Sequence, residues 1–214
     1  MNEKIVIIGA GPHAKVVVDV IKSENRYDII GLVDKVEKSG FWGIDIIGDD
    51  NCLYDLYGRG IKKTVIGIGD NKIRKRLFQQ AKEIGFDIIN VVSDKAIISQ
   101  YAQLGCGVVV MPGAIINADT FIGDGCIINT NCSVDHDNYI GEFSHIAPGA
   151  TLAGSVNIGA GTFCGVGCRI IDGIKIGHNV VIGAGTVIIN PIESNSTVVG
   201  VPAKYIKRKE DKNE

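Results

Sequence analysis

The segment VDHDNYIGEFSHIAPGA, residues 134–150, sets a histidine between two carboxylates, as Asp135-His136-Asp137, among small residues and evenly spaced aliphatic ones. Neutral imidazole has an unperturbed pKa of about 6.5 and can therefore take a proton from a nucleophile near neutral pH. A neighbouring carboxylate can fix the tautomer of the ring and stabilise the imidazolium that forms. The triplet is a candidate general-base site. The same three residues are also compatible with a solvated polar corner that has no catalytic role.

The residues around the triplet follow a six-residue repeat. Stepping by six from Leu104 reaches Ile188 through fifteen consecutive positions, all aliphatic except Cys164, without an insertion. A small or compact side chain stands four residues after most of these positions. This period fits neither a helix nor an alternating strand and is typical of a solenoid whose short strands are joined by corners. We therefore expect the aliphatic side chains to point inward and His136 to be presented at a corner.

Alternating strands and helices are predicted ahead of the repeat. The apolar runs are KIVIIG at 4–9, which leads through a glycine turn into helical spacing, then DIIGLVD at 28–34, KTVIGIGDNK at 63–72 and DIINVV at 87–92. This alternation predicts a small parallel α/β domain whose crevice lies at the carboxyl ends of the strands. The glycine turn could bind NAD or another diphosphate at a helix N-terminus, or it could serve only strand-to-helix packing. Because the domain is too short for a full dinucleotide fold, a mononucleotide-sized ligand fits better.

The composition argues against several classes of function. The 214 residues carry a formal net charge of −2 and no basic stripe, which disfavours nucleic-acid and membrane partners and favours small-molecule chemistry. No apolar stretch approaches the length of a transmembrane helix, and the N-terminal apolar run is too short for a signal peptide, so we expect a cytoplasmic protein. The six cysteines lack paired CxxC spacing, so neither a metal site nor a disulfide framework is expected.

These motifs carry a resemblance at two levels. The six-residue repeat resembles that of the hexapeptide-repeat acyltransferases. The whole chain is similar to the family that groups sialic acid O-acetyltransferases with N-acetyltransferases of nucleotide-linked 4-amino-4,6-dideoxy sugars. The matching segments span nearly the full length and are GAGPHAKVV at 9–17, GDNKIRKR at 69–76, DHDNYIGEFSHIAPGATLAG at 135–154 and VVGVPAK at 198–204.

The resemblance implies an α/β plus all-β fold. Residues 1–92 would form a small Rossmann-like parallel α/β domain that binds a sugar nucleotide. Residues 93–203 would form the acetyltransferase domain, a left-handed parallel β-helix of triangular section, and residues 204–214 a charged, solvated tail. Three hexapeptides make one coil, so His136 would stack over Ala118 and under Gly154. Such proteins are usually homotrimers with active sites at the subunit interfaces.

The resemblance also implies roles for individual residues. His136 would be the general base and Asp137 its orienting partner, a position where some relatives have Glu. Acetyl-CoA would be the co-substrate, without a metal, and the residues implied in binding it are Asn129, His145, Gly154, Gly183 and Lys204. The residues implied in binding the sugar nucleotide are Gly11, His13, Asp34, Lys35, Gly69 and Asn71. Pro12 and Asp70 depart from the residues common in relatives, which bears on the base or sugar accepted.

The leading hypothesis is an acetyl-CoA-dependent N-acetyltransferase that acts on the 4-amino group of a nucleotide-linked sugar in surface polysaccharide synthesis. Direct attack is expected, because Cys132, the nearest thiol in the sequence, occupies a small inward position of the repeat. One alternative is O-acetylation of sialic acid or another sugar hydroxyl, for which the same His/Asp pair would serve. The other is a non-catalytic solenoid scaffold that binds NAD or a nucleotide. The α/β crevice favours a nucleotide-linked acceptor.

Overall fold

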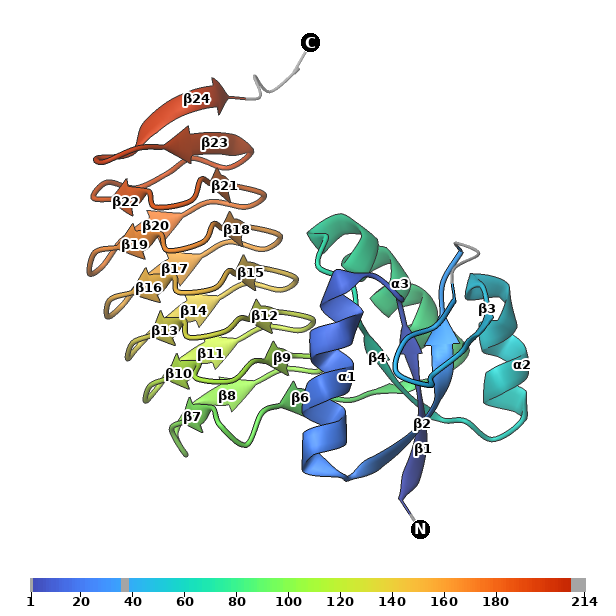
Figure 1. Cartoon of the computed structure of the whole chain (residues 1–214). Helices are drawn as coiled ribbons and strands as arrows, with labels where there is room; N and C mark the ends of the chain where they lie inside the picture. Colours follow the sequence, from blue (N-terminus) through green and yellow to red (C-terminus); the bar gives the residue numbers. More distant parts are fainter. Residues whose placement is uncertain (1, 36–38, 209–214) are drawn as a thin grey trace. The chain divides into compact units, whose positions relative to one another are not determined.

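The computed structural model describes residues 2–35 and 39–208, with the backbone only at 207 and 208. The chain divides into two compact units, Met1–Asp94 and Lys95–Glu214. The first is an α/β unit, and the second is a stack of short parallel strands (Figure 1). Within the described ranges, no helix is long and apolar enough to cross a membrane.

The α/β unit is built on a five-stranded parallel sheet in the order β3-β2-β1-β4-β5. Its elements are β1 (Glu3–Ile8), α1 (Pro12–Glu24), β2 (Tyr27–Val33), β3 (Ile46–Gly48), the 3-10 helix η1 (Asp50–Cys52), α2 (Leu53–Gly58), β4 (Lys63–Ile66), α3 (Asn71–Ile84), β5 (Asp87–Ile88) and β6 (Val91–Val92). The predicted alternation of strands and helices is confirmed, while β3, η1 and α2 are additional to it. The apolar run at 87–92 forms two short strands instead of one.

The central position of β1 follows from its side chains. Ile5, Val6 and Ile7 are fully buried, as expected of a strand that is covered on both faces. Helix α1 buries Val17 and Ile21, which are four residues apart and therefore lie on one face. Because parallel strands end at a common edge, the turns that follow β1, β2 and β4 lie along the carboxyl edge of this sheet.

The second unit is a left-handed parallel β-helix, as predicted. Each strand pairs with the strand one coil away, so that Ile116, Val134 and Leu152 stand in register at steps of 18 residues. The first face of the prism contains β7 (Ile97–Ile98), β10 (Ile115–Ile116), β13 (Ser133–Val134), β16 (Thr151–Leu152), β19 (Arg169–Ile170) and β22 (Val187–Ile188). The second contains β8 (Gln103–Leu104), β11 (Phe121–Ile122), β14 (Tyr139–Ile140), β17 (Asn157–Ile158) and β20 (Lys175–Ile176). The third contains β9 (Val109–Val110), β12 (Ile127–Ile128), β15 (His145–Ile146), β18 (Phe163–Cys164), β21 (Val181–Ile182), β23 (Ser196–Val199) and β24 (Lys204–Arg208).

The six-residue repeat sets the inside of this prism. Ile116, Val134 and Leu152 are fully buried, as the inward position requires. Glycine is needed at some corners because successive coils approach closely. A Cβ on Gly141 would lie 2.5 Å from the backbone nitrogen of Ala160 in the next coil, a distance that backbone cannot accommodate without shifting.

The C-terminal end differs from the expected solvated tail. Residues Lys204–Arg208 form β24, which pairs antiparallel with β23 after the parallel stack. Lys204 is exposed while the backbone of the segment extends the sheet, so a charged composition that suggested a tail is compatible with a strand. The remainder of that predicted tail, 209–214, lies outside the described residues.

Candidate active site

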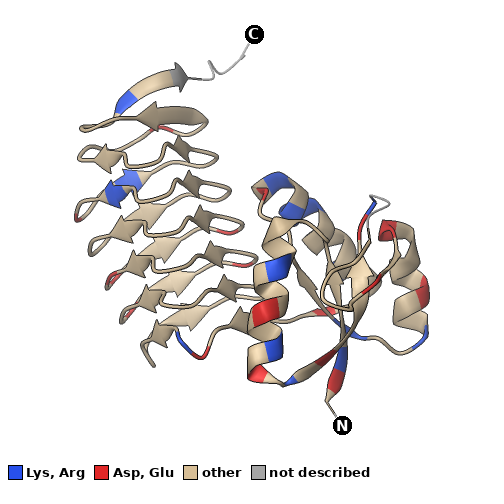
Figure 2. Cartoon of the chain, in the orientation of Figure 1, with Lys and Arg blue, Asp and Glu red and all other residues tan. Residues whose placement is uncertain are grey.

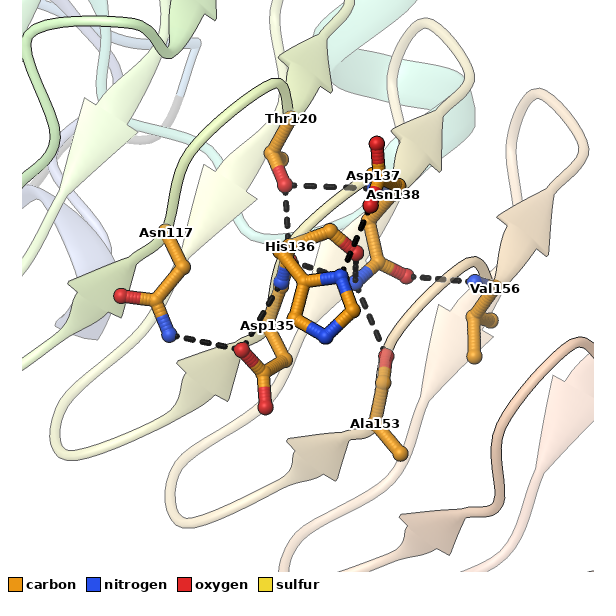
Figure 3. A network of polar contacts seen from close by, with 8 residues as sticks. All are labelled: Asn117, Thr120, Asp135, His136, Asp137, Asn138, Ala153 and Val156. Atoms are coloured by element: carbon orange, nitrogen blue, oxygen red, sulfur yellow. Dashed lines mark hydrogen bonds and ion pairs between the residues drawn. The ribbon is translucent and has the colours of Figure 1, made fainter.

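His136 lies at a corner of the prism formed by residues 135–138, between β13 and β14 (Figure 3). This segment is called the His136 corner. Asp137 adopts a left-handed backbone conformation, with φ of 56°, which turns the chain between the two faces. Nδ1 of His136 lies 2.8 Å from Oδ2 of Asp137, and both side chains are more than half exposed. The predicted histidine and carboxylate are therefore brought into contact.

A buried asparagine holds the backbone of the His136 corner. The Nδ2 group of Asn138 donates to the carbonyl oxygens of Asp135, at 2.6 Å, and of Ala153 in the next coil, at 2.9 Å. Its Oδ1 accepts from the Val156 amide at 3.0 Å, and Thr120 in the preceding coil donates to the Asp135 carbonyl at 2.7 Å (Figure 3). This network ties three coils together beneath the histidine, so the corner is rigid without help from the ring.

The two carboxylates beside His136 have different tasks. Oδ1 of Asp135 accepts from Nδ2 of Asn117 at 2.8 Å and from the backbone amide of His136 at 2.9 Å. The Asn117 bond is the main reason that the pKa of Asp135 is lowered. Asp135 therefore fixes the backbone, and Asp137 is the carboxylate that contacts the ring.

The ring of His136 has the arrangement of a general base. Its pKa is raised, mainly by the hydrogen bond to Asp137, while partial desolvation opposes the rise and nearby carboxylates reinforce it. Because an ionised carboxylate only accepts, we assign the proton of the neutral ring to Nδ1. Nε2 is then left with a lone pair that can take a proton from a bound nucleophile.

Gly154 stands beside Nε2 in the coil above. A Cβ at this position would lie 2.6 Å from Cε1 and 2.9 Å from Nε2 of His136, so a larger residue could fit only if the ring moved. In the described part of the chain, no acceptor takes the backbone N–H of Gly154. A glycine here therefore gives the imidazole its position and leaves an amide donor next to it.

The other residues implied in binding acetyl-CoA lie outside the His136 corner. Nδ2 of Asn129 donates to Nε2 of His145 at 3.0 Å, and the His145 ring packs edge-on against Phe163. Asn129 begins the corner between β12 and β13, and Gly183 occupies the same position three coils further on. Lys204 is exposed in β24. One chain thus brings Asn129 and His145 together, and His136 and Gly154 together, but Asn129 and His136 lie at successive corners.

The residues implied in binding a sugar nucleotide gather at the carboxyl edge of the α/β sheet. Oδ2 of Asp34, after β2, accepts from the backbone amide of Ala10 at 2.7 Å, in the turn after β1. A Cβ on Gly69 would lie 3.8 Å from Cβ of His13, an ordinary contact distance. Gly11 and Asn71 are at the starts of α1 and α3, respectively. Lys35 instead forms an ion pair of 3.2 Å with Asp50.

Arg74 is a site residue that the sequence analysis missed. Its guanidinium is almost fully buried and donates to the carbonyl of Gly69 at 2.9 Å and to Oδ1 of Asn71 at 2.7 Å. Burial, and secondarily the charge of Arg74, lowers the pKa of His13 to about 4, so His13 is neutral near pH 7. The available signal was a cation in the buried stripe of α3, which continues with Leu77 and Phe78.

Cys132, the thiol nearest to His136 in the sequence, is not placed to act as a nucleophile. Cys132 is fully buried in its inward position, and burial raises its pKa to about 12, so its thiol is protonated near neutral pH. Among the described residues, no group of three or more His, Cys, Asp and Glu side chains is arranged to hold a metal ion.

Comparisons with known proteins agree with this fold. A family model described as the PglD N-terminal domain matches residues 4–81. The structure matches that of PerB from Caulobacter crescentus in complex with CoA and GDP-perosamine with a TM-score of 0.92 and 39% identity, over 95% of this chain and 97% of that chain. It matches the acetyltransferase domain of PglB from Neisseria gonorrhoeae FA1090 in complex with acetyl coenzyme A with a TM-score of 0.92 and 34% identity, over 96% and 100% of the two chains. WeeI from Acinetobacter baumannii AYE shares the fold, with a TM-score of 0.85 and 21% identity over 96% and 100%.

The matches to PerB and to the PglB domain cover both units and nearly the whole of each relative. The chain belongs to the hexapeptide-repeat family of nucleotide-linked amino-sugar acetyltransferases.

Proposed function

We propose that the protein transfers the acetyl group of acetyl-CoA to the 4-amino group of a nucleotide-linked 4-amino-4,6-dideoxy sugar, with His136 as general base. The observation that carries this proposal is the contact of His136 Nδ1 with Asp137, which leaves Nε2 available beside Gly154. The relatives bound to GDP-perosamine and CoA, or to acetyl-CoA, support the same pair of substrates.

The α/β unit is the proposed receptor for the sugar nucleotide. The N-terminus of α1 and the glycine turns at the carboxyl edge suit a diphosphate, because backbone N–H groups and the helix dipole favour negative charge there. The β-helix is the proposed receptor for acetyl-CoA. We further propose a homotrimer, in which the Asn129–His145 pair of one subunit completes the site of His136 on another. The reason is that Asn129 and His136 lie at successive corners of one chain.

The proposed reaction proceeds by direct attack. His136 Nε2 takes a proton from the substrate ammonium, and the freed nitrogen lone pair forms a bond to the thioester carbonyl carbon. The carbonyl electron pair moves to oxygen, where the Gly154 N–H can donate to the oxyanion. The carbon–sulfur bond then breaks, and the CoA thiolate takes the proton held by His136. The remaining extra proton on nitrogen passes through the regenerated imidazole to solvent, which leaves the amide.

The direct test is incubation of the protein and acetyl-CoA with UDP-, dTDP- and GDP-linked 4-amino sugars and with free sialic acid, followed by mass spectrometry. We expect one nucleotide-linked amino sugar to gain an acetyl group. Acetylation of sialic acid alone would contradict the proposal in favour of O-acetyl transfer. A thermal shift with NAD but none with acetyl-CoA would favour a non-catalytic binding module.

The pH profile should depend on Asp137. Replacement of Asp137 by Asn removes the main cause of the raised pKa of His136, so that pKa should fall toward its ordinary value. The neutral base would then persist to lower pH, and the acidic inflection of kcat/KM should move to lower pH even though its maximum falls. Kinetics across pH 5 to 9 with the same substrates would check this. An unchanged inflection would mean that another group controls the acidic limb.

Gly69 offers a test of the sugar-nucleotide receptor. Replacement of Gly69 by Leu should weaken sugar-nucleotide binding by about tenfold or more and leave acetyl-CoA binding unchanged, because the added side chain would occupy space at the carboxyl edge. Gly58 is a matched control, since an added Cβ there likewise meets no obstacle, with no neighbour within 4 Å, and this residue ends α2, before the amino end of β4. Calorimetric titration of both ligands would measure the effects, and equal losses for both would contradict this division of labour.

A further inference from the structure

A second carboxylate faces the reactive nitrogen of His136. Asp172 follows His136 by 36 residues, which is two coils of the prism, and is exposed at the same corner position. The point where a Cβ of Gly154 would lie is 2.9 Å from Nε2 of His136 and 3.0 Å from Oδ1 of Asp172. The base and this carboxylate oxygen therefore border the same small space, on the side of the ring away from Asp137.

Asp172 differs from Asp135 and Asp137 because its side chain takes no part in the hydrogen bonds that hold the His136 corner and its ring. Asp135 is engaged by Asn117, and Asp137 by the imidazole. In the part of the chain that the structure describes, no donor forms a hydrogen bond to the Asp172 side chain, and no cation pairs with it. Its oxygens can therefore accept from a bound substrate.

The group that receives the acetyl can be an amine or a hydroxyl, and these two differ in the number of hydrogen-bond donors that they can offer to His136 and Asp172. An alkylammonium, like the side chain of lysine, is protonated near neutral pH and has three N–H donors. It can donate to Nε2 of His136 and to Oδ1 of Asp172 at the same time. A hydroxyl has one O–H donor and no charge, so it can satisfy one of these acceptors but not both.

We propose that Asp172 is a specificity-determining residue, which binds the acceptor ammonium beside His136 and so favours an amine over a hydroxyl. This inference rests on the proposed function, since it takes the sugar amine as the acceptor. It concerns binding before any bond changes. It also gives a physical reason for N- rather than O-acetylation, which the His136–Asp137 pair alone does not provide.

Equilibrium binding tests this proposal without requiring turnover. The probes are GDP-perosamine and the GDP-linked 6-deoxy sugar that has a hydroxyl in place of the 4-amino group, titrated calorimetrically in the presence of CoA. The unmodified protein should bind the amine more tightly. Asp172→Asn should weaken amine binding about tenfold, as expected for loss of a charge-assisted hydrogen bond, and should leave binding of the hydroxyl analogue and of CoA unchanged. Glu142→Gln, which neutralises an exposed carboxylate on another corner, is the matched control and should alter none of these affinities.

The outcomes separate this inference from the function on which it rests. An Asp172→Asn variant that keeps its full preference for the amine would overturn the role of Asp172, even if acetyl transfer proceeds. Equal weakening of both sugar nucleotides would also overturn it, because it would indicate a general effect on the site. A preference for the amine that depends on Asp172, in a protein that acetylates no acceptor, would support this inference and contradict the proposed function.

Discussion

Replacement of His136 by alanine is expected to lower turnover by roughly 10² to 10⁴-fold, the usual loss when a positioned general base is removed. The substrate amine is an ammonium in solution and cannot attack a thioester until it gives up a proton. Nε2 of His136 is the acceptor that the His136 corner offers, because Nδ1 is held by Asp137. The effect should therefore fall on kcat, with small changes in the binding of either substrate.

The alanine variant should fold normally. The His136 side chain is 57% exposed, and the corner is held by Asn138 through bonds to the Asp135 and Ala153 carbonyls. Release of CoA thiol measures turnover, and thermal denaturation measures the fold. His178→Ala is the control, since His178 is exposed on a different corner and should be replaceable with little loss of activity. Turnover of the His136 variant at the rate of the unmodified protein would remove His136 from the mechanism.

The second large effect is expected at Gly154. A methyl group there would lie 2.6 Å from Cε1 of His136, so in Gly154→Ala the ring must turn away from its present position. A displacement of about 1 Å at a catalytic group can cost roughly 10²-fold in rate. We therefore expect a loss of kcat on the order of 10²-fold in a protein that still binds acetyl-CoA.

Gly141→Ala is an informative comparison. At Gly154 the obstacle is an exposed side chain that can move, whereas at Gly141 it is the backbone of Ala160, 2.5 Å from the added Cβ. The first variant should lose activity and keep its melting temperature, and the second should lose stability. Measurement of kcat and melting temperature for both variants separates the two effects. A stable, fully active Gly154→Ala protein would show that the ring position does not depend on this glycine.

The period of the sequence was sufficient to predict the architecture of the second unit. One coil requires a fixed number of residues, so the spacing of inward side chains such as Val134 determines which residues stack. The six-residue spacing also separates two residues to which the resemblance gives related roles. Asn129 and His136 follow consecutive inward positions, Ile128 and Val134, by one and two residues, so they must lie at successive corners. Residues grouped by their role in a family need not be neighbours within one subunit.

Other parts of the site depend on contacts that a local pattern does not specify. Arg74 occurs in a helical segment rich in charge, and only the fold shows that its guanidinium is buried against the turn of Gly69. Asn138 departs from the repeat in place of a small side chain, and its bonds to backbone groups in neighbouring coils account for that departure. The pairing of β24 with β23 was not predicted, because the charged composition of this segment is typical of a solvated tail. In each case the decisive partner is distant in sequence or belongs to the backbone.

The reversal of direction between β23 and β24 also bears on how chains could associate end to end. A stack of parallel strands has the same hydrogen-bonding edge at every level, so an open end would be a template on which further chains could assemble into filaments. An antiparallel strand interrupts this repetition, and its Lys204 adds positive charge to the boundary. Figure 2 shows a basic segment in β24. β24 thus places a strand of opposite direction where a further parallel coil would otherwise pair with β23.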